Sequence, residues 1–276
     1  MLKKILIALD GSANAERAVP WAKRLAAGEK ALVVLLRVVP LGPTDRDVQR
    51  ETREAREYLQ GVERELNYAG IPTKILVRKG LAAHVIPHVA EREGCDLILM
   101  TTRGGSPVQR WAVGGVTEQV MRSSSIPVLP VRSQMALPRQ GHVRRIIVPL
   151  DGSPLAESGV TWAARLARIL KAKMLFVHVM PPGTLRAGSP AERTLQALTR
   201  RFRKVCETLN RTGIPAQFAL QHGDPADRIT QVADRNDLIL TTTHGRGGFK
   251  RWIFGSVAEK LIHHSTVPVL VYKTPA

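Results

Sequence analysis

The chain has 276 residues, of which 44% are hydrophobic and 23% charged, so the composition is that of a globular protein and excludes extensive disorder. Its formal charge of +18 is high, and such a surface attracts nucleic acid, anionic lipid and phosphorylated ligands without distinguishing them. No apolar run is long enough to span a membrane, and the start of the chain reaches Asp10 too early for a signal peptide, so we expect a cytoplasmic protein with no membrane partner.

Strand and helix patterns alternate from the start of the chain. We expect short apolar strands at residues 3–9, 32–39, 73–77, 96–101 and 127–131. Segments with apolar residues at helical spacing lie between them, at residues 12–27, 45–69 and 82–93. Continuous apolar strands of this kind are typical of a parallel sheet that is buried on both faces.

The whole pattern occurs twice. Residues 5–39 align with residues 146–180 at a constant offset of 141, which is 151 minus 10 for Asp10 and Asp151. The offset is 143 around Gly80 and Gly223, which implies two extra residues in the second copy, and it returns to 141 near the end of each copy. A repeat of this length indicates two similar domains in tandem.

The predicted domains are residues 1–135 and 144–276, joined by a polar linker that contains Pro138 and Gly141. Each is expected to be an α/β domain with a doubly wound, Rossmann-like parallel sheet. Such sheets bind ligands beyond the carboxyl ends of their strands, so the loops after the first and fourth strands are the expected functional loops.

The first of these loops reads Asp-Gly-Ser in both copies, starting at Asp10 and at Asp151. A carboxylate at the end of the first strand can accept hydrogen bonds from a ribose hydroxyl or a base amine. The alternative is a purely structural role, in which Ser12 and Ser153 cap the following helices and the glycines permit the turn. We accept the capping role for the serines and favour ligand contact for the two aspartates.

The second loop of the second copy runs from Thr242 through His244 and Gly245 to Gly255 and Ser256, where a helix opens. Glycines let the backbone approach phosphate oxygens, and the amides at the start of a helix supply hydrogen-bond donors and the positive end of the dipole. These features suit a triphosphate, although no Walker lysine motif occurs in the chain.

With these loops in place, the sequence resembles the universal stress protein family over nearly its whole length, as a tandem pair. ATP-binding members of that family carry Gly-x2-Gly-x9-Gly-Ser/Thr after the fourth strand, an aspartate after the first strand and a hydrophobic residue that ends the second. In the second copy only the first glycine departs from this motif, because Thr242 stands in its place. The resemblance assigns a favoured nucleotide site to Asp151, Gly152, Val179, Thr242, His244, Gly245, Arg246, Gly255, Ser256 and Val257.

The first copy resembles the same site with more substitutions. Thr101 replaces the first glycine of the motif and Gly115 replaces the hydroxyl residue, so one donor is lost, which Arg103 could partly replace by contacting phosphate. The weaker site comprises Asp10, Gly11, Val38, Thr101, Arg103, Gly104, Gly114 and Gly115.

The resemblance also implies the strand order 3-2-1-4-5 and dimerisation through the last strand. The two domains of one chain would then form an intramolecular pseudo-dimer, and two chains could associate further as a homodimer. It implies ATP or another adenine nucleotide as ligand, alone or with Mg²⁺, and an unidentified protein partner. The expected function is a nucleotide-dependent regulator of the stress response.

Alternatives to this interpretation remain open. No catalytic residue is assigned, because the chain shows no triad order and no base placed to attack a γ-phosphate, although slow ATP hydrolysis is compatible with the resemblance. A non-nucleotide interaction protein that uses the basic surface is the second hypothesis, and nucleic acid is not expected as the main partner. His84 and His88 lack a third metal ligand nearby, so no metal site is predicted, and Cys95 and Cys206 are expected to be reduced and structural.

Overall fold

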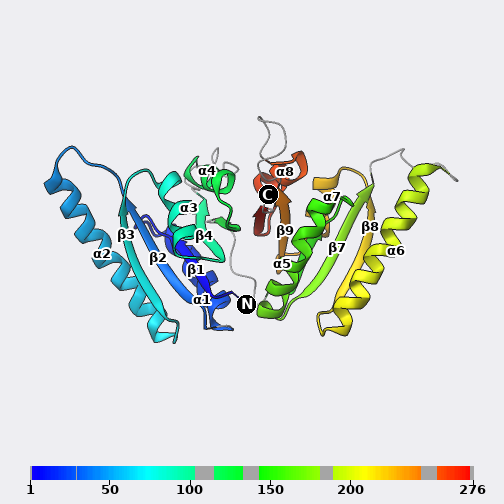
Figure 1. The fold of residues 1–276 in the computed structure, drawn as a ribbon, viewed down its shortest axis with the longest axis horizontal. Coiled ribbons are helices and arrows are strands. Elements are labelled where there is room, and N and C mark those ends of the chain that lie inside the picture. Colours follow the sequence, from blue (N-terminus) through cyan, green and yellow to red (C-terminus); the bar gives the residue numbers. More distant parts are fainter. Residues whose placement is uncertain are drawn as a thin grey trace. The chain divides into compact units, whose positions relative to one another are not determined.

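A computed structural model describes residues 2–28, 30–102, 115–132, 143–180, 189–243 and 254–273 of the chain. The chain divides into two compact units, with the division between residues 137 and 138 (Figure 1). Each unit contains a parallel sheet with helices on both faces.

The sheet of the first unit has the order β3-β2-β1-β4-β5. Its strands are β1 (Lys4–Ala8), β2 (Leu32–Val39), β3 (Thr73–Lys79), β4 (Leu97–Thr102) and β5 (Val128–Arg132). All the pairings are parallel, so the carboxyl ends of the strands lie along one edge of the sheet. The predicted fold class and the strand order 3-2-1-4-5 are confirmed for this unit.

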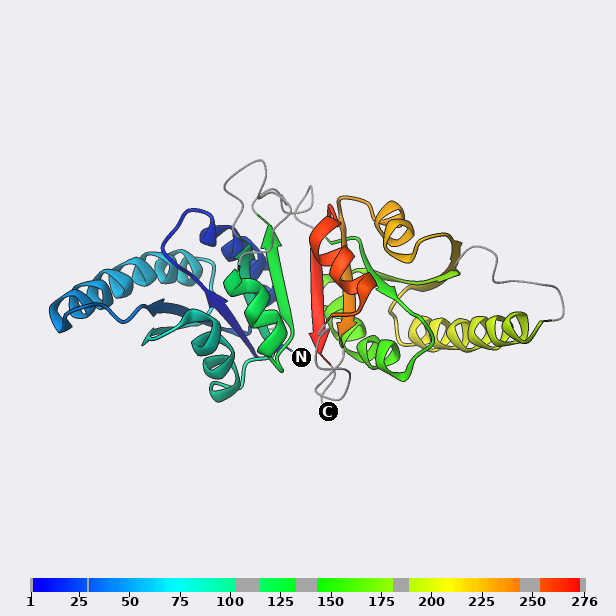
Figure 2. The same cartoon turned by 90° about the horizontal axis from the view of Figure 1, so that it is seen from above.

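Helices cover both faces of this first sheet (Figure 2). The helices are η1 (Ala15–Ala18), α1 (Val19–Ala27), α2 (Asp45–Tyr68), α3 (Ala82–Arg92) and α4 (Gly115–Ser123). An ion pair of 2.6 Å between Lys23 and Glu65 joins α1 to α2 on one face, while α3 packs against α4. The central strands are therefore covered on both sides, and Ile5, Leu6 and Ile7 are fully buried.

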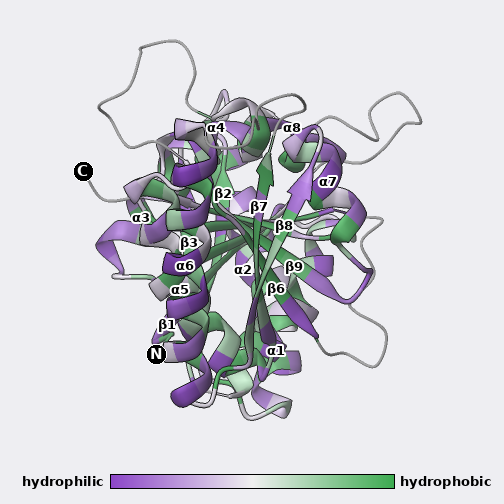
Figure 3. Cartoon of the chain, turned by 90° about the vertical axis from the view of Figure 1, so that its right-hand side faces the viewer, coloured by the Kyte–Doolittle hydropathy of each residue, from purple (hydrophilic) through white to green (hydrophobic). Residues whose placement is uncertain are grey.

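The second unit repeats this topology, with the order β8-β7-β6-β9-β10 when the sheet is followed from β8. Numbered within the unit from β6 as strand 1, this order is again 3-2-1-4-5. Its strands are β6 (Arg145–Pro149), β7 (Lys173–Met180), β8 (Ala216–His222), β9 (Asp237–Thr243) and β10 (Val269–Lys273). Its helices are α5 (Pro154–Leu170), α6 (Pro190–Arg211), α7 (Pro225–Val232) and α8 (Ser256–His264). Figure 3 shows hydrophobic colour along β7, whereas α6 carries hydrophilic patches along its length.

The helix predicted at residues 12–27 forms only in part. The chain makes a turn at residues 11–14, a short 3-10 helix in η1 and only then the α-helix α1. Pro20 has no N–H to donate to the carbonyl of Glu16, and the amide of Val19 binds that carbonyl instead. In the second unit Thr161 occupies the position of Pro20 (20 plus 141), and α5 is continuous from Pro154.

In each unit an aspartate binds neighbouring strands together at their amino-terminal ends, opposite the functional loops. Asp96 accepts hydrogen bonds from the amides of Lys3 and Lys4, at 2.6 and 3.0 Å. Its counterpart Asp237 is only 2% exposed and forms an ion pair of 2.5 Å with Arg145. These contacts join the first and fourth strands, between whose far ends the predicted ligand site lies. None of the described helices is both long and apolar enough to cross a membrane.

Candidate functional site

A hollow of about 330 Å³ opens at the carboxyl ends of the strands in the first unit. It lies where β1 is flanked by β2 on one side and β4 on the other, which is the point at which the strand order reverses. The residues that line it are Ala8, Leu9, Asp10, Ala15, Leu36, Val38, Ala82, Ile86, Met100, Thr101, Gly115, Val116 and Thr117. Binding pockets for small molecules begin at about this size.

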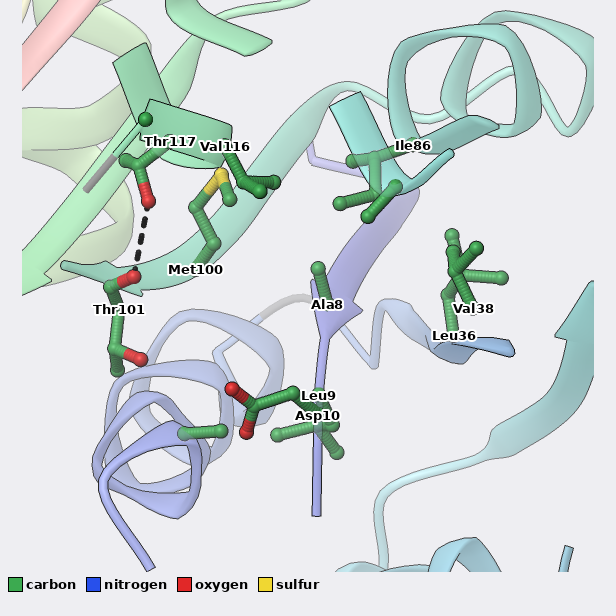
Figure 4. Close-up of a pocket in the computed structure, with 13 residues that line it drawn as sticks. Ala8, Leu9, Asp10, Leu36, Val38, Ile86, Met100, Thr101, Val116 and Thr117 are labelled. Carbon is green, nitrogen blue, oxygen red and sulfur yellow. Dashed lines mark hydrogen bonds between the residues drawn. The ribbon is translucent and has the colours of Figure 1, made fainter. Parts of the chain in front are cut away.

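The walls of the hollow are mainly apolar. Figure 4 shows Met100 and Val116 on one side, Leu36 and Val38 on the other, and Ala8 between them. Ile86 comes from α3 and Val116 from α4, so two helices and three strands contribute carbon atoms to the same space. Such a wall can bury the flat face of an aromatic ring.

Asp10 provides the carboxylate of the hollow. Its Oδ1 accepts hydrogen bonds from the amide and the hydroxyl of Ser12, at 2.9 and 2.6 Å, and these bonds fix the carboxylate in an exposed turn. Within the described part of the chain, Oδ2 of Asp10 has no hydrogen-bond partner. Asp151 repeats the turn, with its Oδ1 accepting from the amide of Ser153 at 2.9 Å. Both turns leave one carboxylate oxygen able to accept a hydrogen bond from a ligand.

The glycine after each aspartate is required by the backbone, because Gly11 has φ of +85° and Gly152 has φ of +86°. A Cβ at Gly11 would also lie 2.9 Å from the Arg37 side chain, whose guanidinium carbon is 5.3 Å from the ring centroid of Tyr58. Burial, together with the Glu16 and Asp10 carboxylates, raises the pKa of Tyr58 above its usual range. Arg37 thus packs α2 against the turn that carries Asp10.

Arg37 has a different counterpart in the second unit. His178 occupies its position (37 plus 141), is 8% exposed and donates from Nδ1 to the carbonyl oxygen of Leu150 at 2.7 Å. In place of the guanidinium, the side chain of Leu198 lies 2.8 Å from a Cβ built at Gly152. The strand-one turn is therefore supported by a cation in one unit and by an aliphatic side chain in the other.

The start of α4 forms the polar end of the first hollow. Thr117 donates from its hydroxyl to the carbonyl of Thr101 at 3.1 Å, which joins the first turn of α4 to the end of β4 (Figure 4). The side-chain amide of Asn14 donates to the carbonyl of Thr102 at 3.1 Å. The first amides of a helix have no partner within the helix and carry the positive end of its dipole, so this end of the hollow suits an anion.

In the second unit, the corresponding helix start is formed by Gly255 and Ser256. Gly255 is the N-cap of α8, with φ of −64° and ψ of 153° and no capping side chain. This backbone conformation is open to any residue, and no described atom lies within 4 Å of a Cβ built at Gly255. Neither the fold nor the packing of the described residues therefore requires glycine at this position. Ser256 is exposed and opens α8.

The structure places the predicted site residues as follows. Asp10, Val38, Thr101 and Gly115 line the first hollow together, and Gly11 lies in the turn beside it. In the second unit, Asp151, Gly152, Val179, Thr242, Gly255, Ser256 and Val257 lie in the strand ends, the strand-one turn and the start of α8. The predicted residues Arg103, Gly104, Gly114, His244, Gly245 and Arg246 lie outside the described residues.

Of the apolar walls, the sequence identified Val38 and missed the rest. Ala8, Leu36, Ile86 and Met100 look like ordinary core residues, because they belong to apolar strands or to an amphipathic helix. The signal that could have identified three of them is position alone, since Ala8, Leu36 and Met100 lie near the carboxyl ends of adjacent strands.

Other reactive groups are structural in the described residues. Cys95 and Cys206 are free and buried, and burial raises the pKa of Cys95 to about 11 and that of Cys206 above its ordinary value, which keeps both thiols protonated. No group of three or more metal-ligating side chains is found among the described residues. Asp224 caps α7 by accepting from the amides of Ala226 and Asp227, at 3.0 and 3.2 Å.

Comparison with known proteins identifies one family twice along the chain. The Universal stress protein family matches residues 1–132 and again residues 142–273. A universal stress protein of Mycolicibacterium smegmatis is 24% identical over 288 residues, covering 98% of this chain and 96% of its own.

The crystal structure of a universal stress protein from Archaeoglobus fulgidus is similar over 98% of both chains, with 22% identity and a TM-score of 0.81, and this likeness concerns the fold. A crystal structure of a universal stress protein in complex with cAMP covers 48% of this chain at 20% identity, with a TM-score of 0.42. That likeness is too low to support an argument about this chain.

Proposed function

The chain belongs to the universal stress protein family, and from this premise we propose that it binds an adenine nucleotide, first of all ATP, and acts as a nucleotide-dependent regulator of the stress response. The observation that supports the proposal most directly is the hollow of about 330 Å³ in the first unit. It combines an apolar wall, an exposed carboxylate and the start of a helix at the strand ends. These are the three chemical features that a base, a ribose and a phosphate chain require.

Each part of the nucleotide has a matching group in this proposal. The apolar side chains around Val38 and Ile86 would bury the base, and the Asp10 carboxylate would accept a ribose hydroxyl. The amides at the start of α4 would bind phosphate oxygens, with Mg²⁺ as an accompanying ion where ATP carries it. In the second unit, Asp151, Val179 and the start of α8 would take the same roles.

We propose the second unit as the tighter of the two sites. Ser256 places a hydroxyl at the first position of α8, where the first unit has Gly115 and no side chain. A serine hydroxyl can donate to a phosphate oxygen in addition to the backbone amides, and such a hydrogen bond to a charged group contributes about 1.5–3 kcal/mol.

The proposed activity is binding rather than turnover. Among the described residues that line the first hollow, Asp10 is the one carboxylate and there is no histidine. Glu118 and Glu259 lie in the first turns of α4 and α8, and Glu118 is paired with Arg122 at 2.6 Å. A bound nucleotide would act by shifting the chain between two conformations that differ in their affinity for a partner. It can shift this equilibrium only as far as the two conformations differ in their affinity for the nucleotide.

Isothermal titration calorimetry with ATP and Mg²⁺ tests the proposal. We expect two binding events per chain. The double variant Ala8→Phe, Gly255→Asp should lose the event of the first unit and bind ATP more weakly at the second, while it keeps its folded far-UV circular dichroism spectrum. Absence of binding heat with the unmodified chain at about 1 mM ATP, the weak limit of a useful affinity, would overturn the proposal.

A further inference from the structure

A second hollow of about 360 Å³ lies in the first unit, between the edge strand β3 and helix α3. Its lining residues are Arg78, Lys79, His84, Val85, His88, Val89, Arg92 and Glu93. None of them lines the hollow proposed for the nucleotide, so the two sites are separate.

The lining carries an excess of positive charge. Arg78, Lys79 and Arg92 are exposed, and no ion pair with an acid is found for them among the described residues. The single carboxylate of the lining, Glu93, is bound by Lys74 at 2.6 Å, and the ammonium of Lys74 holds the pKa of Glu93 below its ordinary value. Lys74 thus matches most of the negative charge of Glu93, and Arg78, which donates to the carbonyl of Val77 at 3.0 Å, also attracts that carboxylate. The lining therefore carries three cations against one carboxylate that is already paired.

The helix side of the hollow presents its polar groups in a column. His84, His88 and Arg92 follow one another at intervals of four residues on α3, so they lie on one face of the helix. With a rise of about 1.5 Å per residue, neighbouring members of the column are separated by about 6 Å along the axis. Arg78 and Lys79 end β3 on the opposite side of the hollow. The hollow thus has a column of polar side chains from α3 on one side and the charged end of β3 on the other.

Protection of a sheet edge does not explain this cluster. Charged side chains on an edge strand discourage pairing with another sheet. However, the equivalent edge strand β8 of the second unit reads AQFALQH and contains no lysine or arginine. With the offset of 143, the positions of Arg78, His84 and His88 are occupied by Gln221, Asp227 and Gln231. The second unit has Arg228 at the position of Val85 (85 plus 143), but it has fewer cations at the equivalent place overall and adds the carboxylate of Asp227. The excess of positive charge is therefore larger beside β3 of the first unit.

The chemistry of the lining selects the class of ligand. Guanidinium groups bind phosphate oxygens in a bidentate manner, and lysine and histidine add further donors. Among the described residues, no tyrosine, tryptophan or phenylalanine lines the hollow, so they give it no platform on which a nucleic-acid base could stack. We propose that this hollow, formed by Arg78, Lys79, His84, His88 and Arg92, binds a short chain of linked phosphate groups, supplied by inorganic polyphosphate or by a polyphosphorylated small molecule.

The probe for this site is inorganic tripolyphosphate, titrated into the full chain at about 150 mM salt, where long-range attraction to the overall charge is screened. We expect saturable binding, and we expect the double variant Arg78→Gln, Arg92→Gln to weaken it about tenfold or more. The control is Arg235→Gln, which removes an exposed arginine of the second unit, in the turn after α7, and should leave the affinity unchanged.

A second pair of titrations separates this site from the nucleotide site and identifies the source of the phosphates. In the Ala8→Phe, Gly255→Asp variant, tripolyphosphate should still bind, whatever happens to ATP. Longer polyphosphate that binds more tightly than tripolyphosphate points to inorganic polyphosphate, and equal affinities point to a small molecule.

Three results would overturn the proposal. The first is equal affinity for tripolyphosphate of the parent chain and of the Arg78→Gln, Arg92→Gln variant. The second is a loss of affinity in Arg235→Gln as large as that in the double variant. The third is the absence of any binding by the parent chain in about 150 mM salt. Unfolding of the double variant is monitored by its thermal transition. Should it unfold, the single variant His88→Gln, at another exposed residue of the column, gives the same comparison with an expected loss of about threefold.

Discussion

Replacement of Gly255 by aspartate separates the effect of a residue on folding from its effect on the proposed ligand. Gly255 is the N-cap of α8, its φ of −64° suits any residue, and no described atom would contact a Cβ at this position. Aspartate is a preferred N-cap residue and is better there than glycine by a few tenths of a kcal/mol. We therefore expect Gly255→Asp to fold, with a free energy of unfolding equal to or slightly above that of the parent.

The affinity of the second unit for ATP should fall in Gly255→Asp, although the stability does not. An N-cap carboxylate accepts from the amides of the first turn of α8, which are the donors proposed for the phosphate chain. It also places a negative charge about 5 Å from a phosphate charge, which costs about 0.8 kcal/mol in water and about 3 kcal/mol at an effective dielectric constant of about 20. The affinity of the second unit for ATP should then fall by roughly 4-fold to 250-fold.

The assay is calorimetric titration with ATP, together with thermal unfolding of each variant. Gly255→Asn is the matched control, because asparagine caps a helix as well as aspartate does but adds no charge. It should weaken ATP binding less than aspartate does, and the difference measures the charge repulsion alone. A folded Gly255→Asp variant that binds ATP at the second unit as tightly as the parent would refute the assignment of phosphate to the start of α8.

Three further predictions concern single residues. Ala8→Phe should fill the hollow of about 330 Å³ and lower the ATP stoichiometry by one per chain in calorimetry, and an unchanged stoichiometry would contradict a site in the first unit. Leu81→Asp should raise the free energy of unfolding in urea by about 0.5–2 kcal/mol, because Leu81 is a 71% exposed N-cap of α3 without a capping bond; no gain would show that the cap is unimportant. Lys260 and the amides of α7 hold the pKa of Asp224 below 3.8, so its contribution to stability is full above that pH and is lost as the pH falls through the lower folded value. Asp224→Asn, which caps without titrating, should lose less stability than the parent in acid melts, whereas identical pH profiles would contradict the linkage.

The fold was predictable because the sequence states its pattern twice. Apolar runs of eight residues rich in β-branched side chains, such as Leu32–Val39, are typical of strands buried on both faces, and the equivalent run recurs as Lys173–Met180 in the second unit. The polar turn at Asp10 was predictable for a similar reason, because core packing does not require an aspartate after a strand. Periodicity could not show the break at Pro20, where one missing N–H divides a helix whose apolar spacing is intact.

Of the apolar part of the site, only the hydrophobic residue that ends the second strand, Val38, was predictable. Hydrophobicity does not distinguish a side chain that lines a hollow from one that fills a core, so Leu36 and Met100 carried no signal of their own. The support of the strand-one turn was equally hidden. Arg37 and His178 occupy the same place in the repeat, yet one packs on Tyr58 and the other binds a backbone carbonyl. Such contacts depend on three-dimensional neighbours that no local pattern encodes.

The two units have similar cores but different surface residues, and this difference helps to interpret the high positive charge. The net charge of +18 would attract any anion if the cations were spread evenly. However, at equivalent places beside the edge strand, one unit has Arg78 and His88 and the other has Gln221 and Gln231. A core of buried strands tolerates such exchanges, because exposed side chains contribute little to its stability. Part of the charge thus gathers around a hollow in the first unit, whereas the equivalent place in the second unit has fewer cations and the carboxylate of Asp227. This difference is expected if the hollow recognises a particular anion and the rest of the charge serves general attraction.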